Sequence, residues 1–278
     1  MTEAIATNTR TQYRRHWLQF RDFCKELACP RKQEKAIKTL ELWVAALSKQ
    51  GVSYGSILTK LAAVRYHWRR SKKDATLSSH RLELMLNGLK KRKKTTRGKN
   101  PITTSHLTRL HKATRSLEKP MALTLRAMTA LAFFGFLRPS ELCISKSNHH
   151  LRRKDVRVSR NNKYCMVKFR LFKHSISPQM IRVDEQTQGP VKPVRTIKRY
   201  LDKSKAASCH QPLFDVTTTE FRNQLDKLCQ SAGIKSTITP HCFRIGGATW
   251  ASKQGWPDAR IQQHGRWRSG AYRAYIKL

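Results

Sequence analysis

Acidic residues are scarce in this sequence: its 278 residues include 17 Asp+Glu against 57 Lys+Arg, a formal net charge of +40 with His neutral. A chain with this surplus repels itself unless a polyanion lies nearby. Nucleic acid is the partner that fits best, and an anionic membrane surface is the weaker alternative. The charge is not confined to a tail, because residues 1–100 hold 24 Lys+Arg and 7 acids and residues 101–278 hold 33 and 10. We therefore expect a folded protein whose two parts both face the polyanion, as a clamp does.

Long apolar runs are also absent. The longest stretch, residues 121–137, is interrupted by Arg126 and falls short of the ~20 residues that span a bilayer. Residues 1–15 hold no apolar run of the kind that forms a secretory signal peptide. These absences exclude membrane insertion. Hydrophobic residues still make up 39% of the chain, with six Trp and ten Phe, which excludes a disordered basic tail.

The cysteines lack the spacing of a metal site or a disulfide framework. Their number is odd and no C-x-x-C pair occurs, so structural zinc and secreted disulfides are both disfavoured. We predict reduced, buried thiols and a protein of the cytosol or nucleus. The seven residues are Cys24, Cys29, Cys143, Cys165, Cys209, Cys229 and Cys242.

Apolar residues in the first part recur at spacings of three and four, which predicts amphipathic helices. Four are expected, at residues 13–24, 40–47, 57–68 and 82–89, with Thr39 as the N-cap of the second. A basic block then runs to Gly98 and Pro101, a pattern typical of a linker. We place the domain boundary near residues 95–101, which gives a helical domain at 1–95 and a second domain at 96–278.

The basic block itself has three interpretations. It could be a solvated connector, a strap that binds DNA phosphates, or a nuclear import signal. The DNA-binding candidates within it are Lys90, Lys91, Arg92, Lys93, Lys94, Arg97 and Lys99.

Beyond Pro101 the pattern becomes mixed. Helices are predicted at 107–117, 123–134, 194–201, 220–232, 241–253 and 258–264. Alternating β-branched and aromatic residues predict short antiparallel strands at 156–158, 164–171 and 181–183, with Asn161 and Asn162 as a turn. The predicted fold class is therefore mainly α with a small antiparallel β-sheet.

Four local features point to chemistry on a phosphate group: residues 132–142, Lys173, residues 239–248 and residues 265–275. Thr239 and Pro240 form an N-cap and N1 pair, so His241 and Arg244 lie one turn apart at a helix N-terminus, where anions bind. Arg binds two phosphate oxygens at once through its planar fork. Arg138, which follows an apolar helix that turns at Gly, would complete a clamp on a pentacovalent phosphorane.

Phosphoryl transfer also needs an in-line nucleophile and an acid for the leaving oxygen. Tyr275 and Lys173 are residues of the required types. Each of these residues alone is unremarkable, since a surface Arg, a capping His or a packed Tyr is common. The order Arg, Lys, His-x-x-Arg, Trp, Tyr in these local contexts carries the inference.

At these residues the sequence resembles the tyrosine recombinase family, the fold of phage integrases. Within it, residues 132–142, 241–248 and 265–276 are most similar to recombinases of DIRS-like and Ngaro-like retrotransposons and of cryptons in eukaryotes. The resemblance implies a helical core-binding (SAM-like) domain followed by an integrase-like catalytic α+β domain. It also implies a C-shaped clamp on double-stranded DNA, a dimer to tetramer on that DNA, no metal and no cofactor.

The resemblance assigns a role to each candidate. Tyr275 would attack the scissile phosphate and form a 3′-phosphotyrosyl bond with release of a 5′-hydroxyl. Arg138 and Arg244 would bind the non-bridging oxygens. The implied activity is site-specific recombination for a mobile element, in a nuclear protein that is cytoplasmic before import.

Three further roles follow from the same resemblance. Lys173, on the hairpin, would protonate the leaving 5′-oxygen. His241 would assist proton movement at the tyrosine, and Trp267 would fill the position where relatives use His or Trp.

Alternatives remain at two of these positions. Tyr272 lies one helical turn before Tyr275 and is the other candidate nucleophile. An ungapped match to integrases would put Arg266 rather than Trp267 in the His/Trp position, and His264 is close by.

The short segment after Tyr275 and the predicted activity each have alternative interpretations. Only Ile276, Lys277 and Leu278 follow Tyr275, which fits either a truncated open reading frame or an assembly unlike that of relatives with a longer C-terminal segment. The alternative function is a transposon-derived DNA-binding protein without catalysis, and a type IB topoisomerase is a weaker third option.

Overall fold

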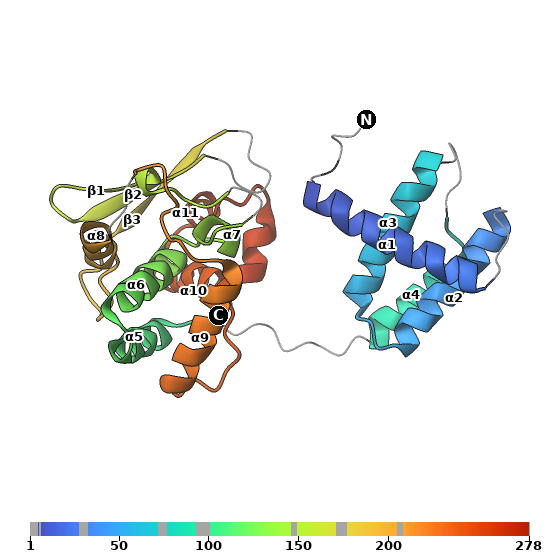
Figure 1. Cartoon of the computed structure of the whole chain (residues 1–278), viewed down its shortest axis with the longest axis horizontal. Coiled ribbons are helices and arrows are strands. Elements are labelled where there is room, and N and C mark those ends of the chain that lie inside the picture. Colours follow the sequence, from blue (N-terminus) through green and yellow to red (C-terminus); the bar gives the residue numbers. More distant parts are fainter. Residues whose placement is uncertain are drawn as a thin grey trace. The chain divides into compact units, whose positions relative to one another are not determined.

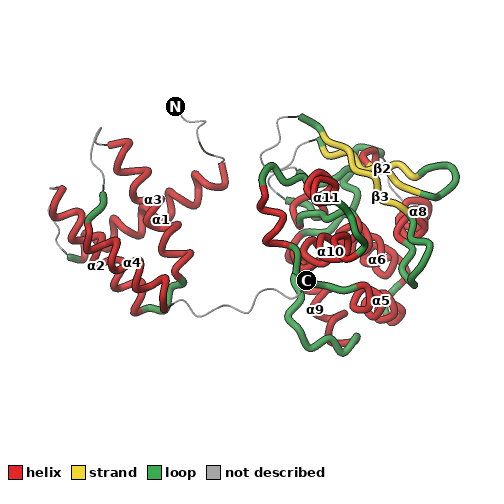
Figure 2. Tube along the Cα trace, turned by 180° about the vertical axis from the view of Figure 1, so that it is seen from behind, coloured by secondary structure: helices red, strands yellow, loops and turns green. Residues whose placement is uncertain are grey.

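The computed structural model describes residue 5 and residues 7–27, 33–71, 77–92, 101–145, 149–170, 177–204 and 208–277. Its chain divides into two compact units, Met1–Thr96 and Arg97–Leu278, seen from opposite sides in Figures 1 and 2. Each unit has a hydrophobic core of its own. The predicted boundary falls in a stretch that lies largely outside the described residues.

The first unit consists of helices packed through their apolar faces. They are α1 (Thr7–Glu26), α2 (Gln33–Lys49), α3 (Tyr54–Ser71) and α4 (His80–Arg92). The predicted apolar spacing is confirmed, since buried positions such as Phe20, Leu61 and Leu82 come from three of the predicted stripes. The predicted N-cap is wrong: α2 begins six residues before Thr39, which is buried within the helix.

The second unit is mostly helical and carries one small sheet, which confirms the predicted fold class. Its elements are α5 (Thr104–Ala113), η1 (Thr114–Ser116), α6 (Lys119–Phe134), α7 (Pro139–Leu142), η2 (Arg153–Asp155), β1 (Val156–Val158), β2 (Tyr164–Phe169), β3 (Gln179–Asp184), α8 (Pro193–Lys203), α9 (Thr218–Ser231), α10 (Pro240–Lys253), α11 (Asp258–His264) and η3 (Gly270–Tyr275).

The sheet has strand order β1-β2-β3 and both pairs are antiparallel. Val167 of β2 lies opposite Val156 on one side and Ile181 on the other, and all three side chains are buried on the core face. The predicted turn between β1 and β2 is confirmed, with Asn162 in the left-handed region at φ +54°. Asn tolerates that region better than other side chains.

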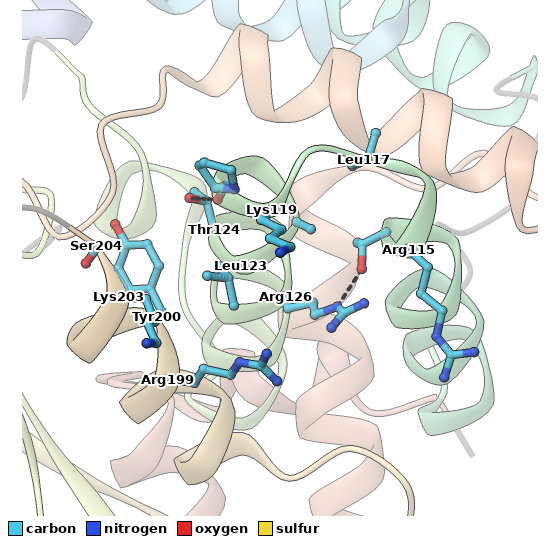
Figure 3. A pocket seen from close by; sticks show the side chains of 13 residues that line it. Arg115, Leu117, Lys119, Leu123, Thr124, Arg126, Arg199, Tyr200, Lys203 and Ser204 are labelled. Carbon is cyan, nitrogen blue, oxygen red and sulfur yellow. Dashed lines mark hydrogen bonds between the residues drawn. The ribbon is translucent and has the colours of Figure 1, made fainter.

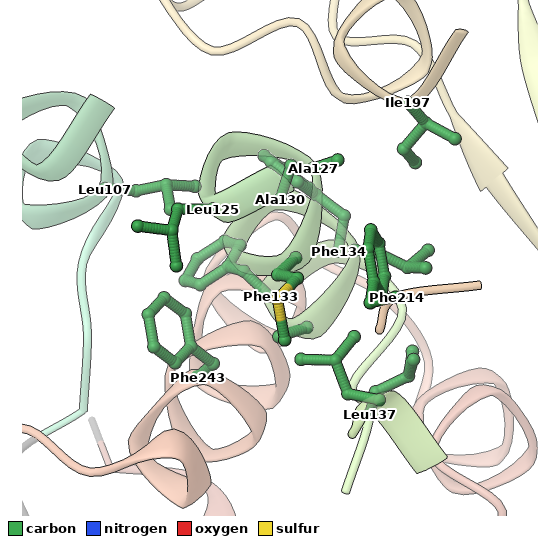
Figure 4. Close-up of a cluster of buried hydrophobic side chains, with 14 of the residues drawn as sticks. Leu107, Leu125, Ala127, Ala130, Phe133, Phe134, Leu137, Ile197, Phe214 and Phe243 are labelled. Atoms are coloured by element: carbon green, nitrogen blue, oxygen red, sulfur yellow. The ribbon is translucent and has the colours of Figure 1, made fainter. Parts of the chain in front are cut away.

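Helix α6 forms the centre of the second core. Its last half is buried on every side, as expected for a helix that is apolar all round. Figures 1 and 2 show it beside α10 and α8. The close-up in Figure 4 shows Phe133 and Phe134 of α6 between Phe243 on one side and Phe214 on the other. This helix therefore fixes the position of the loop that follows it.

Helix α10 packs closely against α6 on one side and against Ile102 on another because it has a glycine at each contact. A Cβ on Gly247 would lie 2.1 Å from Phe133 O, and a Cβ on Gly246 would lie 2.1 Å from Ile102 O. Real Cβ atoms do not come so near to backbone oxygen, so only glycine fits at these two positions. The Gly-Gly pair in the sequence is thus a packing feature of a regular helix.

Two further predictions concern chemistry and environment. Within the described ranges, no helix has the length and apolar character needed to cross a bilayer. Of the cysteines described, four are buried free thiols, as predicted, whereas Cys209 is exposed and Cys24 is half-buried. Cys29 lies outside the described residues.

The glycine contact makes a stability prediction. Gly247→Ala should destabilise the second unit by about 3 kcal/mol, because the clash is with backbone that cannot move aside. Gly88→Ala, also within a helix but with no atom within 4 Å of the new Cβ, should be neutral or up to about 1 kcal/mol stabilising. Calorimetry of the full chain should show a lower transition temperature for the second unit in Gly247→Ala alone. Equal effects of the two changes would contradict the packing role.

Candidate active site

Two helices of the second unit end in the same unusual turn. After α6 and after α11, a Gly at the C-cap is followed by a large residue in the left-handed region, Phe136 at φ +50° and Arg266 at φ +57°. Both turns have the hydrogen bonds of a Schellman motif. Leu137 N–H donates to Ala132 O at 3.1 Å, and Trp267 N–H donates to Gln262 O at 3.0 Å.

This conformation normally belongs to glycine. Helices α2, α9 and α10 end in similar turns with Gly51, Gly233 and Gly255 in the left-handed position. A residue with a Cβ pays roughly 1–2 kcal/mol there. Backbone strain of this kind gathers at functional sites, where surrounding contacts hold it in place. Phe136 and Arg266 are both buried, and the contacts that hold them converge on one cluster of arginines.

The carbonyl groups of the two turns accept hydrogen bonds from two buried guanidinium groups. Arg244 of α10 donates to Phe136 O and, at 2.5 Å, to Gly265 O. Arg266 donates to His264 O at 2.8 Å and to Phe136 O at 3.2 Å. These oxygens lie at helix C-termini, the negative ends of the helix dipoles, where cations are stabilised. The turns therefore supply part of the negative charge that the arginines need.

The rest comes from the carboxylate of Glu141 in α7, a residue to which the sequence alone assigned no role. It accepts hydrogen bonds from Arg138 Nη1 at 2.8 Å, from Arg266 Nη2 at 2.7 Å and from the Arg138 backbone N–H at 2.7 Å. Burial raises the pKa of Glu141, but the charges of Arg266 and Arg138 outweigh it and hold that pKa below its ordinary value. The signal in the sequence was the three-residue spacing from Arg138, which suits a side chain that bonds back to its own helix start.

Positive charge is still in excess at this point. One carboxylate faces three guanidiniums among the described residues, and burial together with Arg138 and Arg266 lowers the pKa of Arg244. Arg244 is fully buried, and its Nε has no hydrogen-bond partner. Arg138 keeps a side-chain exposure of 20%. An anion bound here would offset the excess charge, and of the three guanidiniums Arg138 is the one that remains partly exposed to meet it.

Tyr275 lies against this cluster, at the last residue of η3. Its ring centroid is 5.0 Å from that of Trp267, 5.4 Å from that of His241 and 5.6 Å from the Arg244 guanidinium carbon. Trp267 also covers Arg244, with 4.0 Å between the guanidinium carbon and the ring centroid. His241 and Arg244 project from the first turns of α10, whose N-cap is Thr239 and whose first residue is Pro240, as predicted. Five of the six predicted catalytic residues thus meet in one place.

Tyr272 has a different environment. It is 4% exposed, and its hydroxyl donates to Asp258 at 2.7 Å. Its ring contacts Trp267 from the side of a small apolar cluster with Phe136 and Ile261. Tyr275 is half-buried and faces His241 and Arg244, so of the two tyrosines it is the one that shares a space with the arginine cluster.

The three candidates for the His/Trp position separate in the same way. Trp267 touches both Tyr275 and Arg244. Arg266 is turned away into its ion pair with Glu141. His264 is buried, with its Nε2 bonded to Phe134 O at 2.8 Å, and burial lowers its pKa to about 4. Of these side chains, only Trp267 lies beside the tyrosine.

Two groups of predicted residues are not in this cluster. Lys173 lies outside the described residues, so the structure does not place it. Lys90, Lys91 and Arg92 form the exposed last turn of α4 in the first unit. The remaining candidates of the basic block, Lys93, Lys94, Arg97 and Lys99, also lie outside the described residues.

A basic hollow occupies another part of the second unit. It has a volume of about 990 Å³ and lies where α6 begins, whereas Arg138 follows the other end of that helix. Figure 3 shows Arg115, Lys119, Arg126 and Arg199 around it. Its lining contains no acid and no His or Cys, and its one tyrosine hydroxyl, of Tyr200, donates to a backbone carbonyl. The hollow offers positive charge, but its tyrosine hydroxyl is bonded to backbone and its lining holds no His or carboxylate, so we place the candidate active site at Tyr275.

Comparison with known proteins identifies the fold. The Tn1549 transposon integrase (residues 82–397), solved with circular intermediate DNA, has a TM-score of 0.67 at 14% identity, over 99% of this chain and 91% of that one. A lambda integrase (75–356) dimer bound to a COC′ core site has a TM-score of 0.68 at 12% identity, over 99% and 90%. XerH recombinase bound to palindromic difH substrate has a TM-score of 0.57 at 13% identity, over 88% and 68%. No curated protein matches the chain.

The fold is thus that of the integrases. A family model built from sequences then shows the family itself. The model of the phage integrase family matches residues 100–276, which include the whole Arg138–Tyr275 cluster. The chain belongs to the phage integrase family, whose members are tyrosine site-specific recombinases.

The buried carboxylate makes a prediction with a defined pH dependence. Glu141→Gln should lower the free energy of unfolding by about 3 kcal/mol or more at neutral pH, because the buried guanidinium of Arg266 and the partly exposed one of Arg138 lose their counter-ion. Since the pKa of Glu141 is lowered in the folded protein, this contribution is complete above the unfolded pKa of about 4.5 and is lost as the pH falls through the folded value. The wild type and the variant should therefore become equally stable in acid. Urea denaturation between pH 7 and pH 3 measures this.

Asp226→Asn is the matched control, because Asp226 is exposed on α9 of the same unit. It should change stability little at any pH in this range. A constant difference between wild type and Glu141→Gln down to pH 3 would contradict the ionic role of Glu141.

Proposed function

We propose that this protein is a site-specific DNA recombinase that cleaves and rejoins strands through a 3′-phosphotyrosyl intermediate. The observation that carries the proposal is the contact of Tyr275 with Arg244, His241 and Trp267 beside a cluster with excess positive charge. A phenol next to an anion-binding cluster is the arrangement that nucleophilic attack on a phosphodiester requires.

In the first step, the Tyr275 oxygen forms a bond to phosphorus and the bond from phosphorus to the 5′-oxygen breaks. The phenol proton passes to a base, for which His241 is our candidate because its ring lies beside that of Tyr275, and the leaving oxygen takes up a proton from an acid. Lys173 is our candidate for that acid, on the family pattern. Arg138 and Arg244 stabilise the charge that develops on the non-bridging oxygens. Trp267 covers one side of the phosphate site and limits the access of water.

In the second step, the 5′-hydroxyl of another strand attacks the phosphotyrosyl bond and releases the tyrosine. The energy of the first phosphodiester is kept in the protein–DNA bond, so rejoining needs no external energy source. The two steps are each other's reverse, so one set of residues serves both.

Double-stranded DNA is the proposed partner. The charge of +40 is distributed over both parts of the chain, as contacts with many phosphates require. Lys90, Lys91 and Arg92 are exposed and free to reach a phosphate backbone. Two of the similar structures hold integrases on DNA, one of them as a dimer, which supports a homo-oligomer of two to four subunits on DNA.

The proposed biological setting is a eukaryotic mobile element of the DIRS-like, Ngaro-like or crypton type. The Gly-Arg-Trp box at 265–267 supports it, because that group carries this sequence and other integrases carry His or Trp one position earlier. A nuclear location follows from this setting, with the basic block at 90–99 as the import signal.

Covalent capture tests the reaction and its nucleophile. The substrate is a duplex taken from the repeats that flank the coding sequence, nicked near the cleavage point so that the short 5′-hydroxyl fragment diffuses away and religation is lost. Wild type and Tyr272→Phe should give a covalent protein–DNA band on denaturing gels, because Tyr272 is engaged with Asp258. Tyr275→Phe should give none, because it lacks the attacking oxygen.

Tight binding of that DNA by the wild type without a covalent band would instead favour a DNA-binding protein that has lost catalysis. A band lost in Tyr272→Phe and kept in Tyr275→Phe would reverse the assignment of the nucleophile.

The arginine clamp makes a separate prediction. Arg138→Ala should lower the rate of covalent capture by about 10²- to 10³-fold, the usual effect of losing one preorganised donor to the transition state. Its DNA affinity should fall only a few-fold. Arg199→Ala removes the same charge at the basic hollow, away from Tyr275, and should cleave at the wild-type rate. Parallel loss of affinity and cleavage in Arg138→Ala would identify Arg138 as a general DNA contact.

A further inference from the structure

Thr249 lies in the middle of α10 and touches the chain on both sides of the residue that follows Tyr275. Its hydroxyl oxygen is 3.1 Å from Tyr275 O and accepts the Lys277 backbone N–H at 3.1 Å. It is also 2.9 Å from Ile245 O, one turn back in its own helix. The side chain is 6% exposed, so water does not compete for these bonds.

Among the described residues, the Tyr275 carbonyl and the Lys277 N–H have no hydrogen-bond partner other than Thr249. Tyr275 is the last residue of η3, and the next residue, Ile276, is extended at φ −79° and ψ 121°. The last carbonyl groups of a helix receive no hydrogen bond from within that helix, so each needs a donor from elsewhere. Thr249 donates to that carbonyl or to Ile245 O, and it receives the N–H two residues on. The bond from the Lys277 N–H holds the chain after Ile276 whichever carbonyl takes the hydroxyl proton, and the contact with Tyr275 O lies on the other side of Ile276.

These two points fix where the Tyr275 side chain starts. Ile276 packs on the small cluster with Phe136 and Ala248, and the backbone around it is bonded to α10, the helix that also carries Arg244. The proposed nucleophile, Tyr275, and the proposed phosphate-binding residue, Arg244, are therefore both held in place by helix α10. We infer that Thr249 is a positioning residue for Tyr275, acting through the backbone on both sides of Ile276. This inference rests on the proposed function of Tyr275 as the nucleophile.

The test compares three variants in covalent capture by the full chain. Thr249→Val keeps the shape and removes the hydroxyl, and it should slow capture about 10- to 100-fold at unchanged DNA affinity, since small misplacements of reacting groups have effects of this size. Thr249→Ser keeps the hydroxyl and should restore the rate to within a few-fold of wild type. Thr129→Val is the control: Thr129 is buried in α6 and has a similar bond to its own helix, to Leu125 O at 2.7 Å. It should lose stability and cleave normally.

A second readout does not depend on activity. The Lys277 amide proton should exchange slowly with solvent in wild type and Thr249→Ser and rapidly in Thr249→Val, as measured by NMR on the free protein. Equal capture rates for wild type and Thr249→Val, or a Ser variant as slow as Val, would overturn the inference. If wild type gives no covalent band while the Lys277 amide follows the expected pattern, the proposed function has failed and the restraint on Tyr275 stands. Unchanged exchange in Thr249→Val would overturn that restraint as well.

Discussion

The structure around Tyr275 depends on how three guanidinium groups are held next to one another inside a protein. Coulomb repulsion between Arg138, Arg244 and Arg266 opposes the fold, and the single carboxylate of Glu141 does not neutralise it. Carbonyl oxygens at the C-termini of α6 and α11 offset part of the remaining positive charge, because they carry the negative ends of the helix dipoles. What is left is a net positive, partly desolvated site, and that is the property from which affinity for a phosphate follows.

The two strained turns are part of the same arrangement. With a glycine in place of Phe136, the turn after α6 would lose strain, and it would also lose a ring that packs against His264 and Trp267. With a glycine in place of Arg266, the second turn would leave Glu141 with one partner. The contacts of each large side chain with the opposite turn offset the conformational strain at its own turn. This coupling aligns Arg138 and Trp267, which come from segments far apart in the sequence.

Much of this could be predicted from the sequence, where the signal is local. Apolar spacing, the Thr239–Pro240 helix start and the Asn161–Asn162 turn are properties of a few adjacent residues, and the structure agrees with each. The N-cap assigned to Thr39 failed because α2 continues through it on an apolar face that packs in the core. The turn after α6 was placed correctly, yet its left-handed residue is Phe136 and not the adjacent glycine. That choice is made by tertiary contacts, which no local propensity contains.

The roles of Glu141 and Thr249 could not be predicted from the sequence, because they too depend on tertiary contacts. Each acts on residues from a different element, so its partners become visible only when α7, α10 and η3 are assembled. The close approach of α10 to α6 at Gly247 is what makes this assembly possible. It brings the Arg244 guanidinium to Phe136 O, and it brings Thr249 to the backbone beside Tyr275. A glycine pair next to a His-x-x-Arg motif is therefore informative about the site: it permits the helix contact that brings the Arg244 guanidinium to the turn after α6.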